Sequence, residues 1–184
     1  MQSIAAKFAG SAEAAHKSWG WYLALGLIFI GAGVYAIAYG SAATIASIIA
    51  LGALLFLAGC TQIAGAFFAR GAGHATLFLL AGVLDIVIGG MLIQHPGAGA
   101  LTVTLLLASL FIFSGALRFV TALWLQFPQY GWVALGSLVS VALGVFLWAQ
   151  WPVSATWFIG FAVGVNFIIA GIVWSAVAFK LKSI

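Results

Sequence analysis

The 184-residue sequence has very few charged side chains, which make up only 4% of its residues. Its two acidic residues are Glu13 and Asp85, and its six basic residues are scattered along the chain, giving a formal net charge of +4. Basic residues this sparse form no stripe that could follow a nucleic-acid backbone. We therefore expect no nucleic-acid partner.

Cysteine and motifs for enzyme chemistry are equally scarce. Cys60 is the single cysteine, so the chain cannot form an internal disulfide. The sequence has no paired cysteine or histidine motif for a metal, and its histidines, at positions 16, 74 and 95, fall at the edges of apolar segments, where they cannot ligate haem within the membrane. Nucleophile triads and phosphate-binding loops are also missing. We expect a protein that is not an enzyme and that uses no metal or cofactor.

Apolar residues dominate what remains. They make up 66% of the chain, whose mean hydropathy is +1.28, far above that of soluble domains. A helix of about 20 apolar residues crosses the roughly 30 Å hydrocarbon core of a bilayer. Six such segments lie at 20–39, 42–69, 75–94, 98–125, 131–149 and 153–179. The fold class is therefore expected to be all-α, a polytopic protein of the lipid bilayer with six transmembrane helices.

The distribution of basic residues predicts how the chain is oriented. One side of the membrane receives all the basic residues that flank the helices, namely Lys7, Lys17, Arg70, Lys180 and Lys182. By the positive-inside rule this side is cytoplasmic, so both termini are expected there. Tryptophans cluster near both ends of the segments, as in an aromatic belt. Residues 3–17 are consistent with a short amphipathic helix on the inner surface or with a frayed tail.

Self-comparison reveals an internal repeat, because the second, fourth and sixth segments superpose without gaps at one constant offset. Gly59, Gly115 and Gly171 coincide in these segments, and Gly52, Ala108 and Gly164 coincide two helical turns earlier. Small residues every two turns create a helix face that a second helix can approach closely. The odd-numbered segments align on Gly26, Gly82 and Gly136, the last after a two-residue slip.

The repeat predicts three helical hairpins as the domain organisation. A cytoplasmic segment at 1–18 precedes repeat 1 at 19–70, repeat 2 at 74–126 and repeat 3 at 130–181. The repeats run parallel to one another, unlike the inverted repeats of many alternating-access carriers.

Asp85 and Arg118 are the charged residues within the apolar segments, and we expect them to form an intramembrane charge pair. An ionised side chain at the centre of a membrane helix costs roughly 2.5–3.5 kcal/mol on insertion scales, so it needs a partner, a proton or a water-filled cavity. The repeat places Gln62 and Trp174 at positions equivalent to Arg118. The pair is either a protonation-sensitive element or structural glue between the third and fourth helices, and Arg118 could alternatively extend to the inner headgroups.

His95 is a candidate pH sensor at an outer turn. Histidine is the side chain that gains charge when the pH falls from neutral to mildly acidic values. The competing interpretation is an inert histidine on an exposed turn. Other polar residues in the segments, such as Asn166, Thr102 and Ser114, are typical of hydrogen bonding between or within membrane helices, with a lined pathway as the alternative.

The order of these features resembles the HdeD family of bacterial acid-resistance membrane proteins. The resemblance covers nearly the whole chain after residue 18, and its closest patches are Gly82-Val-Leu-Asp-Ile-Val-Ile and Phe113-Ser-Gly-Ala-Leu-Arg118-Phe. It implies a non-enzymatic protein of the bacterial inner membrane that acts under acid stress through membrane assembly or permeability.

Two other functions stay open at this point. One is a small channel or carrier for protons or a neutral solute, which requires a continuous polar cavity. The other is a non-catalytic helical subunit of a larger membrane complex, in which the small-residue faces dock onto other proteins. The acid-resistance function and the function as a subunit of a complex both predict a homo-oligomer or a place in a membrane complex.

The orientation makes a direct prediction. In a Cys60→Ser chain, single cysteines placed in the 40–41 and 96–97 turns should react with a membrane-impermeant thiol reagent added outside intact cells. Cysteines near 72 and 128 should react only after the cells are opened. Labelling of residue 72 in intact cells would contradict the topology.

Overall fold

The computed structural model describes residues 19–68, 72–125 and 130–182. They form six α-helices, α2 (Trp19–Ala38), α3 (Gly40–Ala66), α4 (Ala72–Gln94), α5 (Pro96–Leu125), α6 (Tyr130–Ala149) and α7 (Ser154–Lys182). All six are long and apolar enough to cross a membrane, and the described residues contain no strand. The predicted fold class is confirmed, and each helix begins and ends within three residues of its predicted segment. The expected segments at 1–18 and around Arg70 lie outside the described residues.

The helices carry large apolar side chains all around their surfaces. Trp21, Phe113 and Leu138 are each at least 60% exposed, although a soluble domain would bury such side chains. A helix that is hydrophobic on every face is suited to lipid, which covers these side chains in a membrane. The chain is therefore a multi-pass membrane protein.

Short turns join α2 to α3, α4 to α5 and α6 to α7. Pro96 begins α5 directly after His95, at the first helical position, where the missing N–H of proline costs no helix hydrogen bond. At the start of α7, the buried hydroxyl of Ser154 donates a hydrogen bond to the Leu147 carbonyl in the last turn of α6, with a length of 2.8 Å. Ser154 thereby satisfies a carbonyl that the end of α6 leaves free.

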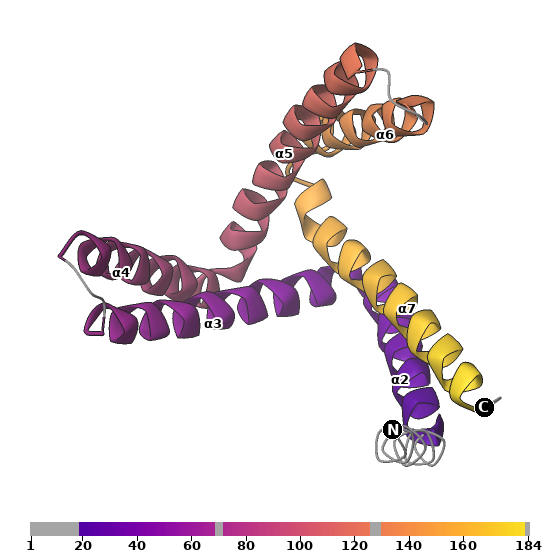
Figure 1. Cartoon of the computed structure of the whole chain (residues 1–184), viewed down its shortest axis with the longest axis horizontal. Helices are drawn as coiled ribbons and strands as arrows, with labels where there is room; N and C mark the ends of the chain where they lie inside the picture. The colour runs from indigo at the N-terminus through magenta and orange to yellow at the C-terminus, as the bar shows by residue number, and fades with distance from the viewer. Residues whose placement is uncertain (1–18, 69–71, 126–129, 183–184) are drawn as a thin grey trace, which may run out of the picture. The chain divides into compact units, whose positions relative to one another are not determined.

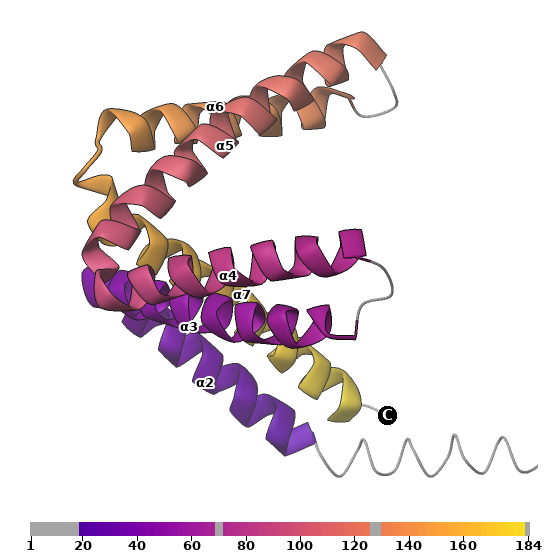
Figure 2. The same cartoon turned by 90° about the vertical axis from the view of Figure 1, so that its left-hand side faces the viewer.

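The chain divides into two compact units, which we describe separately. One contains α2 and the part of α7 from Gly160 onward, and the other extends from Gly40 to Ile159. In the second unit α3 lies beside α4, and α5 lies beside α6; in the first, α2 lies beside α7 (Figures 1 and 2). Each close pair thus joins helices from two different repeat units. The helices α3 and α4 come from repeats 1 and 2, α5 and α6 from repeats 2 and 3, and α2 and α7 from repeats 1 and 3.

Glycine permits the closest approach between α3 and α4. A Cβ atom added to Gly59 would lie 2.5 Å from the Gly82 carbonyl oxygen, and one added to Gly52 would lie 2.8 Å from the Gly89 oxygen. No side chain fits at such distances, so the two backbones touch at two points that are two helical turns apart. Backbones this close gain van der Waals contact, which holds helices together where lipid removes the hydrophobic driving force.

The other two pairs repeat this arrangement. A Cβ on Gly144 of α6 would lie 2.7 Å from the Ala108 oxygen of α5, and one on Gly33 of α2 would lie 2.6 Å from the Gly164 oxygen of α7. All the small residues of the expected packing face are buried in these contacts: Gly52, Gly59, Ala108, Gly115, Gly164 and Gly171.

The third odd-numbered helix follows a different register from the expected one. Gly136, which aligns with Gly26 and Gly82 in the sequence, faces open space. The neighbouring Ser137 is only 2% exposed, and a Cβ added to Gly115 would lie 2.9 Å from the Ser137 oxygen. Relative to the constant repeat offset, α6 is therefore shifted by one residue rather than two. The shift follows from which residue of α6 faces α5, and that residue is a serine rather than the glycine of the other repeats.

This register generates a matched pair of substitutions on α6. Gly144→Ala should lower the melting temperature of the protein in detergent, because its new methyl group would overlap the Ala108 carbonyl and force the helices apart. Gly136→Ala places the same methyl group in open space and should leave the melting temperature unchanged or slightly higher, since alanine favours helix. Equal melting temperatures for the two variants would contradict the packing face.

Candidate functional site

A side-chain hydrogen bond links Asp85 of α4 to Gln62 of α3. Gln62 Nε2 donates to Asp85 Oδ2 over 2.6 Å, and both side chains are partly buried. Each residue follows by three positions a glycine of the close contact, Gly59 or Gly82. Helical side chains lean toward the amino end of their helix, so the two side chains converge on that contact from opposite directions.

The expected ion pair between Asp85 and Arg118 is not formed among the residues that the structure describes. The reason is the pairing of the helices. The expected pair requires α4 to present Asp85 to α5, but the glycine contacts pack α4 against α3. The nearest polar group across that contact is therefore Gln62. Gln62 and Asp85 each follow a packing glycine by three residues, and this shared spacing is the sequence signal that could have identified the hydrogen bond.

Arg118 occupies the position of Gln62 in the next helix pair. The repeat offset that relates Gly59 to Gly115 also relates Gln62 to Arg118. On the facing helix α6, Ser140 stands where Asp85 stands on α4, and its hydroxyl donates to the Gly136 carbonyl of its own helix over 3.0 Å. The Arg118 side chain is exposed, and its guanidinium has no hydrogen-bond or ion-pair partner within the described ranges.

The third equivalent position is aromatic. In the unit formed by α2 and α7, the ring of Trp174 stacks on Tyr22 with 5.7 Å between ring centroids. Phe29, at the position of Asp85, meets Phe167 edge to face at 5.6 Å. Thus one position of the repeat holds a polar bond, a cation without a partner among the described residues, and an aromatic stack in its three copies.

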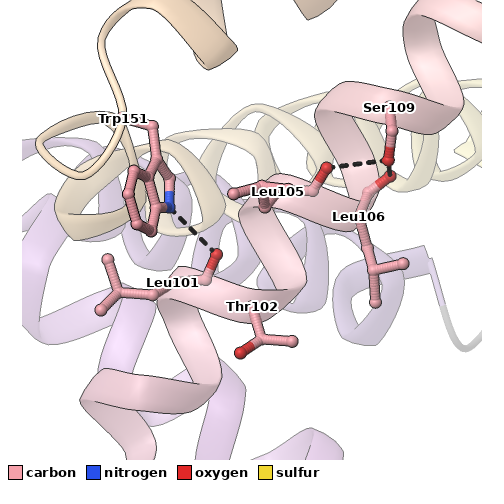
Figure 3. Close-up of a pocket in the computed structure, with 6 residues that line it drawn as sticks. All are labelled: Leu101, Thr102, Leu105, Leu106, Ser109 and Trp151. Atoms are coloured by element: carbon pink, nitrogen blue, oxygen red, sulfur yellow. Dashed lines mark hydrogen bonds between the residues drawn. The ribbon is translucent and has the colours of Figure 1, made fainter.

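Four of the cavities along the described helices have volumes between about 170 and 380 Å³. One of about 260 Å³ is bordered by the indole of Trp151, whose Nε1 donates to the Leu101 carbonyl over 3.4 Å (Figure 3). Another of about 260 Å³ includes the exposed His95 in its lining. Neither these two nor the other two, of about 170 and 380 Å³, are lined by Gln62, Asp85 or Arg118.

The described residues contain no group of three or more histidine, cysteine or acidic side chains that could hold a metal ion. Cys60 is exposed on α3, on a helix surface that faces lipid in a membrane. The chemistry of the site is therefore that of a carboxyl group, an amide and a separate guanidinium within membrane-spanning helices.

A family model described as a short repeat of unknown function (DUF308) matches the chain twice, at residues 24–94 and 80–149. The two matches begin at 24 and 80, and this offset is the same one that separates Gly59 from Gly115. The internal repeat is thus confirmed. Comparisons with curated proteins and with solved structures gave no match.

The Gln62–Asp85 hydrogen bond predicts energetic coupling across the α3–α4 pair. In a double-mutant cycle with Gln62→Leu and Asp85→Leu, we expect a coupling free energy of about 1 kcal/mol, the scale of hydrogen bonds between membrane helices. Unfolding in detergent, dilute enough to isolate single copies, measures it. A matched cycle with Arg118→Leu and Asp85→Leu should give a value near zero. Coupling of Asp85 to Arg118 but not to Gln62 under these conditions would overturn the assignment.

Proposed function

We propose that this chain, which belongs to the family of the short repeat of unknown function (DUF308), is a non-enzymatic protein of the bacterial inner membrane that acts in acid or stress resistance. Its resemblance to HdeD proteins supports the physiological role. The proposed mode of action is assembly within the membrane, with both termini in the cytoplasm.

One observation carries the choice of assembly over conduction. The polar groups of Gln62 and Asp85 bind each other across a tightly packed helix pair, and none of the four cavities reaches them. A proton or solute pathway would instead place such groups along a cavity that water can enter. Polar groups that bond across helices are typical of membrane assembly.

Asp85 also supplies a chemical link to acid. A carboxyl group loses its negative charge when it takes up a proton, whereas an amide offers both donors and an acceptor. Gln62 can therefore stay bonded to Asp85 in either charge state. We propose that contacts outside the α3–α4 pair, which do depend on the charge, transmit the response to acid.

Survival of acid challenge tests the proposal. A strain that lacks this protein should survive less well, and the wild-type chain should restore survival. Asp85→Asn should fail to restore it although immunoblots show equal amounts in the membrane, and Asp85→Glu, which keeps a carboxyl group, should restore it at least in part. Unchanged survival of the deletion strain would refute the role in acid resistance.

A second candidate function, a channel or carrier for a neutral solute, is favoured by a different observation. The cavity of about 170 Å³ lies between the first turns of α3, α5 and α7, and hydroxyl-bearing Ser41, Thr44 and Thr156 contribute to its lining. One turn farther along α5, Thr104 is fully buried, and its hydroxyl has no hydrogen-bond partner among the described residues.

Liposome flux separates the two candidates. Liposomes that contain the purified protein should show the same proton and glycerol fluxes as protein-free liposomes if assembly is the mode of action. Faster flux that Thr104→Val abolishes would support the second candidate and contradict the first.

A further inference from the structure

We propose that Arg118 of one copy of this chain binds Asp85 of a second copy within the membrane. The inference deepens the proposed mode of action, on which it rests, by naming the partner as a second copy and the contact as an ion pair. It follows from the charges that the described helices leave unbalanced and from the depth at which the repeat places them.

Each of the two residues leaves a charge without an opposite charge. Asp85 has a hydrogen bond from Gln62, but the amide is neutral and does not compensate a carboxylate. Ser140, which stands on α6 where Asp85 stands on α4, bonds to its own backbone, and the Arg118 guanidinium has no partner in the described part of the chain. Two uncompensated charges of opposite sign in membrane-spanning helices each cost free energy, and pairing them lowers both costs.

The repeat shows that the two side chains lie at compatible depths. Gln62 and Arg118 are equivalent residues of parallel repeats, so in one membrane they lie at equivalent depths along α3 and α5. Gln62 reaches Asp85 from that depth with a hydrogen bond of 2.6 Å. The arginine side chain is longer than glutamine and offers five N–H donors, so the same depth brings its guanidinium within reach of an Asp85 carboxyl on a neighbouring molecule.

The surfaces around both residues suit a contact inside the bilayer. Leu117 beside Arg118 is 53% exposed, and Leu84 beside Asp85 is 61% exposed. Asp85 is itself only partly buried, so its side chain stays accessible at the edge of the α3–α4 pair. Each copy therefore offers one cation and one carboxyl group on two different apolar surfaces, and the contact joins unlike surfaces of two copies.

A mixing experiment with two single variants tests this contact. Asp85→Asn keeps Arg118, and Arg118→Gln keeps Asp85. Native mass spectrometry of the full chain released from mild detergent should show oligomers for the wild type and mainly monomers for each variant alone, with association weakened about thirtyfold or more. The two variants co-expressed with different tags should form a 1:1 dimer, because one complementary pair remains between them.

Each other outcome has a distinct meaning. Wild-type monomers, or variants that associate as the wild type does, would refute the contact. If Arg118 instead pairs with Asp85 in the same chain or holds a lipid phosphate, mixing the variants would yield no dimer. Circular dichroism and melting of each variant establish that loss of association is not loss of folding. Mass spectrometry counts the copies in the particle independently of the survival assay. The contact between copies can therefore be refuted while the role in acid resistance stands, and the role can be refuted while the contact stands.

Discussion

Close approach of helix backbones at pairs of small residues is the constraint on which the rest of this structure depends. In a bilayer, an apolar side chain gains little free energy when it leaves lipid tails to pack against another helix, because both environments are apolar. Helices are therefore held together by van der Waals contact and by hydrogen bonds. Each of the three close pairs obtains this contact at two positions, such as Gly52 with Gly89 and Gly59 with Gly82. The remaining apolar surface is then free to face lipid, which explains how a chain so hydrophobic folds with so little of it buried.

The number and type of helices could be predicted from the sequence because they depend on local composition. A run of about 20 predominantly apolar residues has one stable form in a bilayer, the helix, and the length of the run determines where the helix begins and ends. The spacing of Gly52 and Gly59, and of their equivalents in the other repeats, likewise identifies the buried face, since two full turns return to the same side of a helix. Both inferences need only information within one segment.

The partners of the helices could not be predicted in the same way. The repeat suggests that helices joined by the short outer turns are the natural pairs, and this pairing is what matches Asp85 to Arg118. Sequence periodicity says which face of α4 packs but not which helix meets it, and α3 and α5 carry the same pattern of small residues. The register of α6 could not be predicted from the sequence for a related reason. Gly136 and Ser137 are adjacent, and only the packing shows which of them faces α5.

The pairing of α2 with α7 has a consequence for how the protein is made. Gly26 packs against Gly171, so its partner is synthesised only after the four intervening helices, α3 to α6. At about 5–20 residues per second, the packing face of α2 waits on the order of ten seconds in the membrane while the other helices are inserted. The α3–α4 and α5–α6 pairs, whose helices are consecutive, need no such wait. Assembly of the nascent chain is therefore ordered, because α2 is inserted before α3 to α6 but packs against α7 only after them.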